Sequence, residues 1–122
     1  MTEETITIDK IKTELSLWVC DVDFWQDEVE DSQKTLEVNL QKIDEAPEKK
    51  KLEQFQNQII YYRDELLPQL KHDLVKQQAI LENKAEDKEM RKQYNELELR
   101  IAAIHEQMKE RRRQLDLFVE NI

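Results

Sequence analysis

Apolar residues recur at alternating steps of three and four residues along three long stretches of this chain, and the chain contains no glycine. Such spacing places one narrow apolar stripe along a helix, as in the seam of a coiled coil or a helical bundle. Turns that need positive φ usually depend on glycine, so its absence indicates that little of the chain is loop. The sequence therefore predicts an all-α fold of long helices joined by short connections.

The first and third stretches keep this spacing over most of their length. In the first stretch, the predicted seam residues are Ile8, Ile11, Leu15, Trp18, Val22, Trp25, Val29, Leu36, Leu40 and Ile43. In the third stretch, they are Met90, Tyr94, Leu97, Ile101, Ile104, Met108, Leu115, Phe118 and Ile122. Because each such side chain gains about 1.5–3 kcal/mol on burial, we expect the chain to fold independently.

Proline and helix-ending signals set the expected boundaries of three helices. We expect helices over about 7–44, 47–83 and 87–121, with Pro47 in the first turn of the second. Short connections make consecutive helices antiparallel. The expected architecture is therefore an up-down-up three-helix bundle, coiled-coil-like and formed as a single domain over residues 1–122.

The seam of the second stretch shifts by one residue near Pro68. Leu66 belongs to the first frame and Leu67 opens the second. A proline inside a helix removes one hydrogen bond and clashes with the carbonyl four residues back. We therefore predict a kink or a π-bulge at 64–68, which would absorb the extra residue. The prediction also places Pro68 beside Trp25, where the kink either makes room for the indole or forms a hinge or binding notch.

The net charge of -9 arises in the first 46 residues, which carry thirteen acids and four bases. This surplus disfavours nonspecific binding to nucleic acid or to an anionic membrane, since both need a basic surface. No apolar stretch approaches the roughly 20 residues that a membrane span needs. The single cysteine, Cys20, cannot form an internal disulfide and fits a reducing compartment. We expect a cytoplasmic protein with no nucleic-acid or membrane partner.

Patterns typical of catalysis or metal binding are missing from the sequence. The Glu-x-x-His pattern of carboxylate-bridged metal sites fails at both histidines, because Gln69 precedes His72 by three residues and Ala102 precedes His105 by three. The acids around Cys20 work against a reactive thiolate, and a chain without glycine has no glycine-rich phosphate loop. We therefore expect no enzyme, no catalytic residue, no cofactor and no metal site.

An apolar stripe bordered by acids is the most suggestive surface feature. From Asp21 to Asp31 the chain carries six acids and no base, and Leu17, Cys20 and Phe24 follow an i, i+3, i+7 spacing away from the seam. Such a stripe is typical of a surface that binds another helix. The predicted partner-binding residues are Leu17, Cys20, Asp21, Phe24, Asp27 and Asp31. The alternatives are a solvated acidic face and a wider face buried within the bundle.

One charged residue, Arg111, occupies a seam position where an apolar residue is expected. Ser32 and Tyr62 fall at the same level of the bundle. The three residues Ser32, Tyr62 and Arg111 are therefore predicted to form a structural polar layer, of the kind that fixes helix register. The alternative is that Arg111 extends to solvent along its aliphatic stem.

The chain resembles a spectrin-type repeat in its length, in the tryptophan midway along the first helix, and in the ending Arg112, Arg113, x, Leu115. The third helix lacks the tryptophan that such repeats usually carry. The resemblance implies the three-helix architecture and transfers no binding residues. We expect a non-enzymatic interaction module that binds a basic protein partner. The alternatives are a self-associating structural homo-oligomer and a carrier of a small ligand or metal at the notch between Pro68 and Trp25.

Overall fold

The structure, a computed structural model, describes residues 3–83 and 88–122, nearly all of which are helical. Its elements are α1 (Glu3–Asn39), the 3-10 turn η1 (Leu40–Lys42), α2 (Ala46–Tyr61), the π-helical turn η2 (Tyr62–Leu66), α3 (Leu67–Asn83) and α4 (Lys88–Glu120). These ranges contain no strand, so the fold is all-α, as predicted. Among the described residues, no helix combines the length and apolar composition needed to cross a bilayer.

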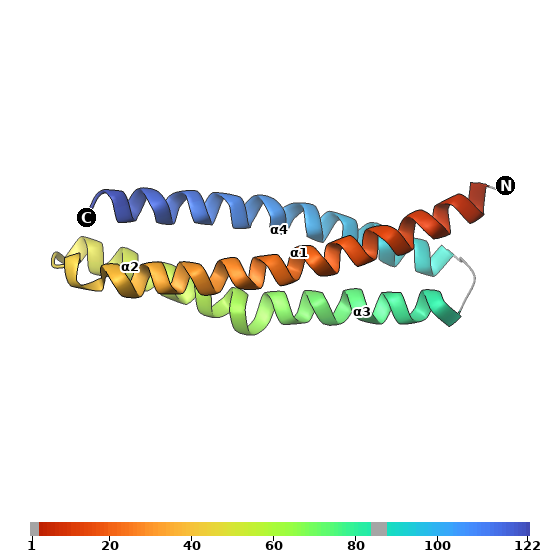
Figure 1. The fold of residues 1–122 in the computed structure, drawn as a ribbon, viewed down its shortest axis with the longest axis horizontal. Helices are drawn as coiled ribbons and strands as arrows, with labels where there is room; N and C mark the ends of the chain where they lie inside the picture. Colours follow the sequence, from red (N-terminus) through yellow and green to blue (C-terminus); the bar gives the residue numbers. More distant parts are fainter. Residues whose placement is uncertain (1–2, 84–87) are drawn as a thin grey trace.

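The helices lie side by side in one elongated body (Figure 1). The C-terminus lies at the end where α1 turns into α2, and the N-terminus lies at the opposite end. Ion pairs connect helices that are far apart in sequence. Lys71 Nζ of α3 lies 2.7 Å from Asp23 Oδ1 of α1, and Arg100 Nη1 of α4 lies 2.9 Å from Asp73 Oδ2 of α3. Residues distant in the sequence therefore meet along the length of this body.

The first helical stretch begins and ends earlier than the predicted range 7–44. It starts at Glu3 and ends at Lys42, where η1 tightens its last turn. The Ile43 N–H donates to the Leu40 carbonyl at 3.1 Å, and Ile43 itself is extended, with φ −98 and ψ 105. A 3-10 turn closed in this way satisfies a carbonyl at the helix end. The predicted start of the last helix, at 87, lies outside the described residues.

The predicted second helix is divided by the π-helical turn η2. The Leu67 N–H donates to the Tyr62 carbonyl five residues back, so this turn holds one residue more than an α-helical turn. The predicted π-bulge is therefore confirmed, although it begins two residues before the range 64–68. The physical cause is Pro68, which has no N–H and whose ring would clash with the Asp64 carbonyl in a regular helix.

The core follows the predicted seams closely. The side chains that are most completely buried come from α1 and α3: Ile11, Leu15, Val22, Leu67, Leu70 and Leu74. Leu67 is 0% exposed, whereas Leu66 is only half-buried. This difference confirms that the seam moves by one residue, because the π-helical turn rotates everything after it.

The end of the first seam differs from the prediction. Asn39 is buried, whereas Leu40, the predicted seam residue, is 41% exposed. Position 39 lies seven residues beyond Ser32 and fourteen beyond Trp25, so the regular heptad frame leads to Asn39. The buried amide is satisfied locally, since Asn39 Nδ2 donates to the Thr35 carbonyl at 2.8 Å.

Candidate protein-binding surface

The outward side of α1 carries exposed apolar side chains in its middle. Leu17 is 57% exposed, Phe24 is 60% exposed, and Cys20 between them is an exposed free thiol. The same helix buries Val22 and Trp25 against its neighbours. The alternative of a wider buried face is therefore wrong. We call Leu17, Cys20 and Phe24 the outer apolar stripe.

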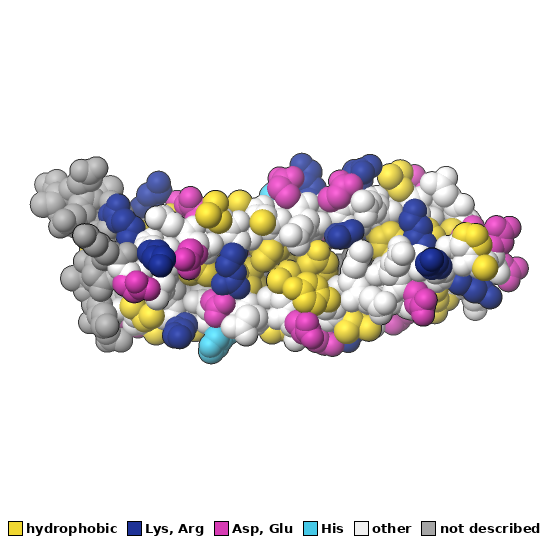
Figure 2. Space-filling view, turned by 180° about the vertical axis from the view of Figure 1, so that it is seen from behind, with side chains coloured by type: hydrophobic (Ala, Val, Ile, Leu, Met, Phe, Trp, Pro, Cys, Tyr) yellow, Lys and Arg dark blue, Asp and Glu magenta, His cyan; other side chains and the backbone are white. Residues whose placement is uncertain are grey.

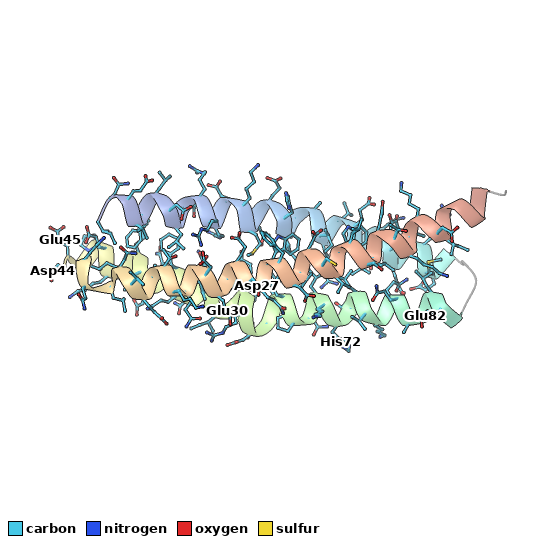
Figure 3. The ribbon with its side chains drawn as sticks, viewed as in Figure 1. Asp27, Glu30, Asp44, Glu45, His72 and Glu82 are labelled. Carbon is cyan, nitrogen blue, oxygen red and sulfur yellow. The ribbon has the colours of Figure 1, made fainter. Side chains whose placement is uncertain are left out.

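The acids around the outer apolar stripe fall into two groups. Asp21 and Asp27 are exposed and form no hydrogen bond or ion pair with any other described residue. Asp31 is paired instead, because its Oδ2 lies 2.9 Å from Arg112 Nη1 of α4. Figure 3 shows Asp27 and Glu30 projecting from the middle of α1. Two of the three predicted acids thus remain available to a partner, while Asp31 belongs to the contact between α1 and α4.

A groove between α1 and α4 adjoins the outer apolar stripe, and no pattern in the sequence predicted it. Its volume is about 270 Å³. The groove is lined by Phe24, Trp25 and Glu28 of α1 and by His105, Met108, Lys109 and Arg112 of α4. The centres of the Trp25 and His105 rings lie 6.2 Å apart across it. We call this feature the α1–α4 groove. The sequence could not predict this groove, because it places Phe24 on the first helix but does not show which residues of α4 pack at the same level.

The described aromatic contact of Trp25 is with α4 and does not involve Pro68, beside which a notch was predicted. Trp25 is only 5% exposed and packs against His105 of α4. Pro68 is exposed and does not line the α1–α4 groove. His72 is also exposed and points away from the other helices (Figure 3). A ligand site at the notch between Pro68 and Trp25 therefore stays a prediction.

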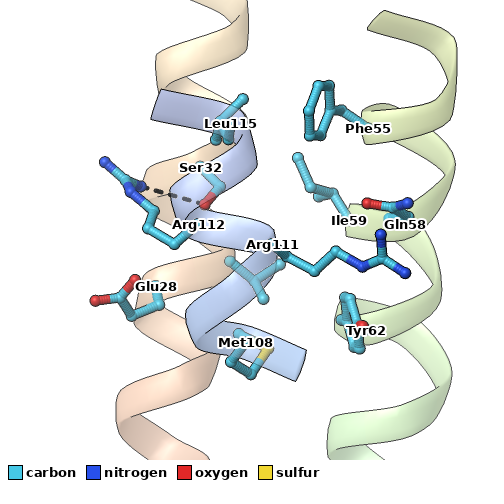
Figure 4. A pocket seen from close by; sticks show the side chains of 11 residues that line it. Glu28, Ser32, Phe55, Gln58, Ile59, Tyr62, Met108, Arg111, Arg112 and Leu115 are labelled. Atoms are coloured by element: carbon cyan, nitrogen blue, oxygen red, sulfur yellow. Dashed lines mark hydrogen bonds between the residues drawn. The ribbon is translucent and has the colours of Figure 1, made fainter. Parts of the chain in front are cut away.

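The predicted polar layer has a different arginine from the expected one. Arg112 Nη1 donates to the Ser32 hydroxyl oxygen at 3.2 Å, whereas Arg111 is exposed. Figure 4 shows the two arginines leaving α4 in different directions, with Arg111 extending towards Gln58 on α2. Successive residues of a helix point about 100° apart, so only one of the two can face α1. The hydrogen bond to Ser32 therefore comes from Arg112, and Arg111 is an exposed side chain at the same level of the bundle.

Tyr62, the third predicted member of the layer, bonds to another residue. Its side chain is buried, and its hydroxyl donates to Gln107 Oε1 of α4 at 3.3 Å. Ser32, Tyr62 and Arg111 nevertheless line one small cavity of about 30 Å³ (Figure 4). The three residues are thus brought to one level of the bundle without bonding to one another.

Two short-range ion pairs hold exposed arginines. Arg113 Nη2 lies 2.6 Å from Glu110 Oε1, and Arg63 Nε lies 2.8 Å from Asp64 Oδ1. The hydrogen bond from Arg113 lowers the pKa of the Glu110 carboxyl, and the hydrogen bond from Arg63 lowers the pKa of the Asp64 carboxyl in the same way.

Charges of both signs are mixed on the face of the molecule shown in Figure 2, and apolar side chains gather near the middle of that face.

In the described parts of the chain, no three His, Cys, Asp or Glu side chains gather into a group that could hold a metal ion. The sequence matches no model of a known protein family, and neither the curated proteins nor the solved structures give a significant match. A functional assignment for this chain therefore rests on the geometry and charge of the outer apolar stripe and the α1–α4 groove.

Proposed function

We propose that this chain is a non-enzymatic protein–protein interaction module whose outer apolar stripe binds a protein partner. In this proposal the fold is a spectrin-like three-helix bundle with up-down-up topology, in which α2, η2 and α3 act as one bent helix. The exposure of Leu17 and Phe24, at 57% and 60%, is the observation that carries it. Two large apolar side chains on one exposed face are typical of an interaction surface.

The surroundings of the stripe support a protein partner. Asp21 and Asp27 border the apolar residues and have no bonding partner among the described residues. An apolar centre with a charged rim is the usual composition of a protein–protein interface. The exposed thiol of Cys20 is compatible with the reducing cytoplasm, which is the location we propose for this module.

Self-association on this surface is disfavoured by charge. Residues 1–46 carry thirteen acids and four bases, so a second copy docked on α1 through its own α1 would bring acids opposite acids. Like charges brought together at an interface oppose association. The proposal therefore names a foreign partner, and the homo-oligomer is the alternative that a measurement of solution mass detects.

Site-specific photo-cross-linking in the cells that express the protein tests the proposal. Leu17 is replaced by p-benzoylphenylalanine, and the matched control carries the same replacement at Leu99, which is 73% exposed on α4. We expect a covalent product with another protein from position 17 and none from position 99. A chain that gives no product at position 17, or gives the same products from both positions, contradicts the proposed function.

Light scattering during gel filtration separates the foreign partner from the second copy. We expect the purified chain to elute as a monomer of 14.8 kDa over a range of concentrations. A stable dimer that Phe24→Ser dissociates would assign the stripe to self-association and replace the proposed function with the structural homo-oligomer.

A further inference from the structure

We infer that the partner of the outer apolar stripe is a basic amphipathic helix, which lies along α1 and inserts one apolar side chain into the α1–α4 groove. This inference rests on the proposed function and specifies the class of partner. Three properties of the surface lead to it: the spacing of the apolar residues, the distribution of unpaired acids, and the composition of the groove.

The spacing of the stripe matches a helical partner. Leu17, Cys20 and Phe24 form a line along two turns of α1, which is about 10 Å at 1.5 Å per residue. A second helix that crosses α1 at a shallow angle presents its own side chains at the same three- and four-residue steps. An added β-strand would need unpaired backbone groups, and the backbone around the stripe is engaged within α1. A helix is therefore the partner that the stripe fits.

The acids that remain unpaired call for a basic partner. Asp23 and Asp31 are neutralised by Lys71 and Arg112, respectively. The exposed acids Asp21, Asp27 and Glu30 form no ion pair or hydrogen bond within the described parts of the chain. These negative charges favour Lys or Arg on the partner and disfavour nucleic acid, an anionic membrane and a second copy of this chain.

The α1–α4 groove indicates which side of the partner is apolar. Phe24, Trp25 and Met108 line a space of about 270 Å³, which an aliphatic or aromatic side chain can enter. Methionine adapts to different apolar shapes, and Lys109 on the α4 side of the groove repels a cation. Glu30 lies on the side of α1 away from α4 (Figure 3). The partner therefore directs its apolar side chains towards the groove and its cations towards the other side of α1.

Alkylation of Cys20 reports on this surface, because Cys20 is the single thiol of the chain and lies within the stripe. The probe is a designed helical peptide with leucine at its seam positions and lysine elsewhere. The control peptide has glutamate in place of every lysine. At a concentration ten times its dissociation constant, the leucine–lysine peptide is expected to slow Cys20 alkylation about tenfold, because only the uncovered fraction reacts. The leucine–glutamate peptide is expected to leave the rate unchanged.

Three variants of the full chain locate the contact. Phe24→Ser is expected to weaken peptide binding by about tenfold or more, as for a central apolar anchor. Asp27→Asn combined with Glu30→Gln is expected to weaken binding at low salt and to reduce its salt dependence. Leu99→Ser, the matched control on α4, is expected to bind as the wild type does. Circular dichroism verifies that each variant keeps its helical content.

Two results would overturn the inference: equal protection of Cys20 by both peptides, or peptide binding that leaves Cys20 unprotected. The inference and the proposed function can fail separately. If the partner captured at position 17 is neither basic nor helical, the proposed interaction module stands and the inference of a basic helical partner is wrong. If no partner is captured, both the proposed function and this inference are wrong.

Discussion

Arg112 of α4 bridges to Asp31 of α1, with its Nη1 2.9 Å from the Asp31 Oδ2 and its side chain only 30% exposed. The preceding residue, Arg111, occupies the regular seam position, but its side chain is exposed and extends towards Gln58 of α2. The contact between α1 and α4 at this level is therefore polar, and the seam position contributes no apolar side chain. A cavity of about 30 Å³ remains beside it.

Leucine at position 111 is expected to stabilise the fold. Arg111→Leu would place an apolar side chain against the cavity that Phe55 and Leu115 line, and we expect the free energy of unfolding to rise by about 1 kcal/mol. Urea unfolding followed by circular dichroism measures the change. Arg113→Leu, at an exposed position, is the control and should stay within about 0.5 kcal/mol of the wild type. A destabilised Arg111→Leu chain would mean that the guanidinium has a buried partner.

The Asp31–Arg112 pair is expected to contribute modestly to stability. Asp31 is 66% exposed at its side chain, so solvent screens much of the attraction. A double-mutant cycle with Asp31→Asn and Arg112→Gln should give a coupling free energy of about 0.2–1 kcal/mol. The coupling should fall as salt is added, since salt screens exposed charges. A coupling that does not respond to salt would contradict an electrostatic contact.

The π-helical turn predicts unequal effects at two adjacent leucines. Leu67 is 0% exposed after the seam shift, whereas Leu66 is half-buried. We expect Leu67→Ala to lower the free energy of unfolding by about 2–5 kcal/mol, the range for a fully buried leucine. The loss for Leu66→Ala should be clearly smaller, and urea unfolding compares the two directly. The reverse order would place the seam in an uninterrupted α-helical frame.

The pKa of Glu110 is expected to depend on Arg113. The hydrogen bond from Arg113 lowers the pKa of the Glu110 carboxyl, so Arg113→Gln should raise it towards its ordinary value. A lowered carboxyl pKa stabilises the folded chain above the unfolded-state pKa, and this contribution is lost as the pH falls through the folded-state pKa. Carboxyl NMR titration measures the shift. Asp64, which is paired with Arg63, is the internal control and should titrate unchanged in both chains.

The sequence predicted the helices and their buried faces well, because these features depend on residue order along one chain. Apolar spacing indicated the seams, and Pro68 together with the shift to Leu67 indicated the π-helical turn. The error at Leu40 came from choosing a four-residue step where the heptad frame continues to Asn39. The sequence also identified the apolar residues of the stripe, Leu17 and Phe24, but left open whether they are buried.

By itself, the sequence of this protein determined that it is helical, where most of its core lies, and where one helix takes in an extra residue. These properties follow from periodicity and from the geometry of proline. Only the tertiary structure decided that Leu17 and Phe24 face outwards, that Arg112 rather than Arg111 reaches α1, and that Trp25 meets His105. Those outcomes depend on how far α1 and α4 are each rotated about their own axes when they pack. The packing of all the helices together sets that rotation, and no single stretch of sequence specifies it.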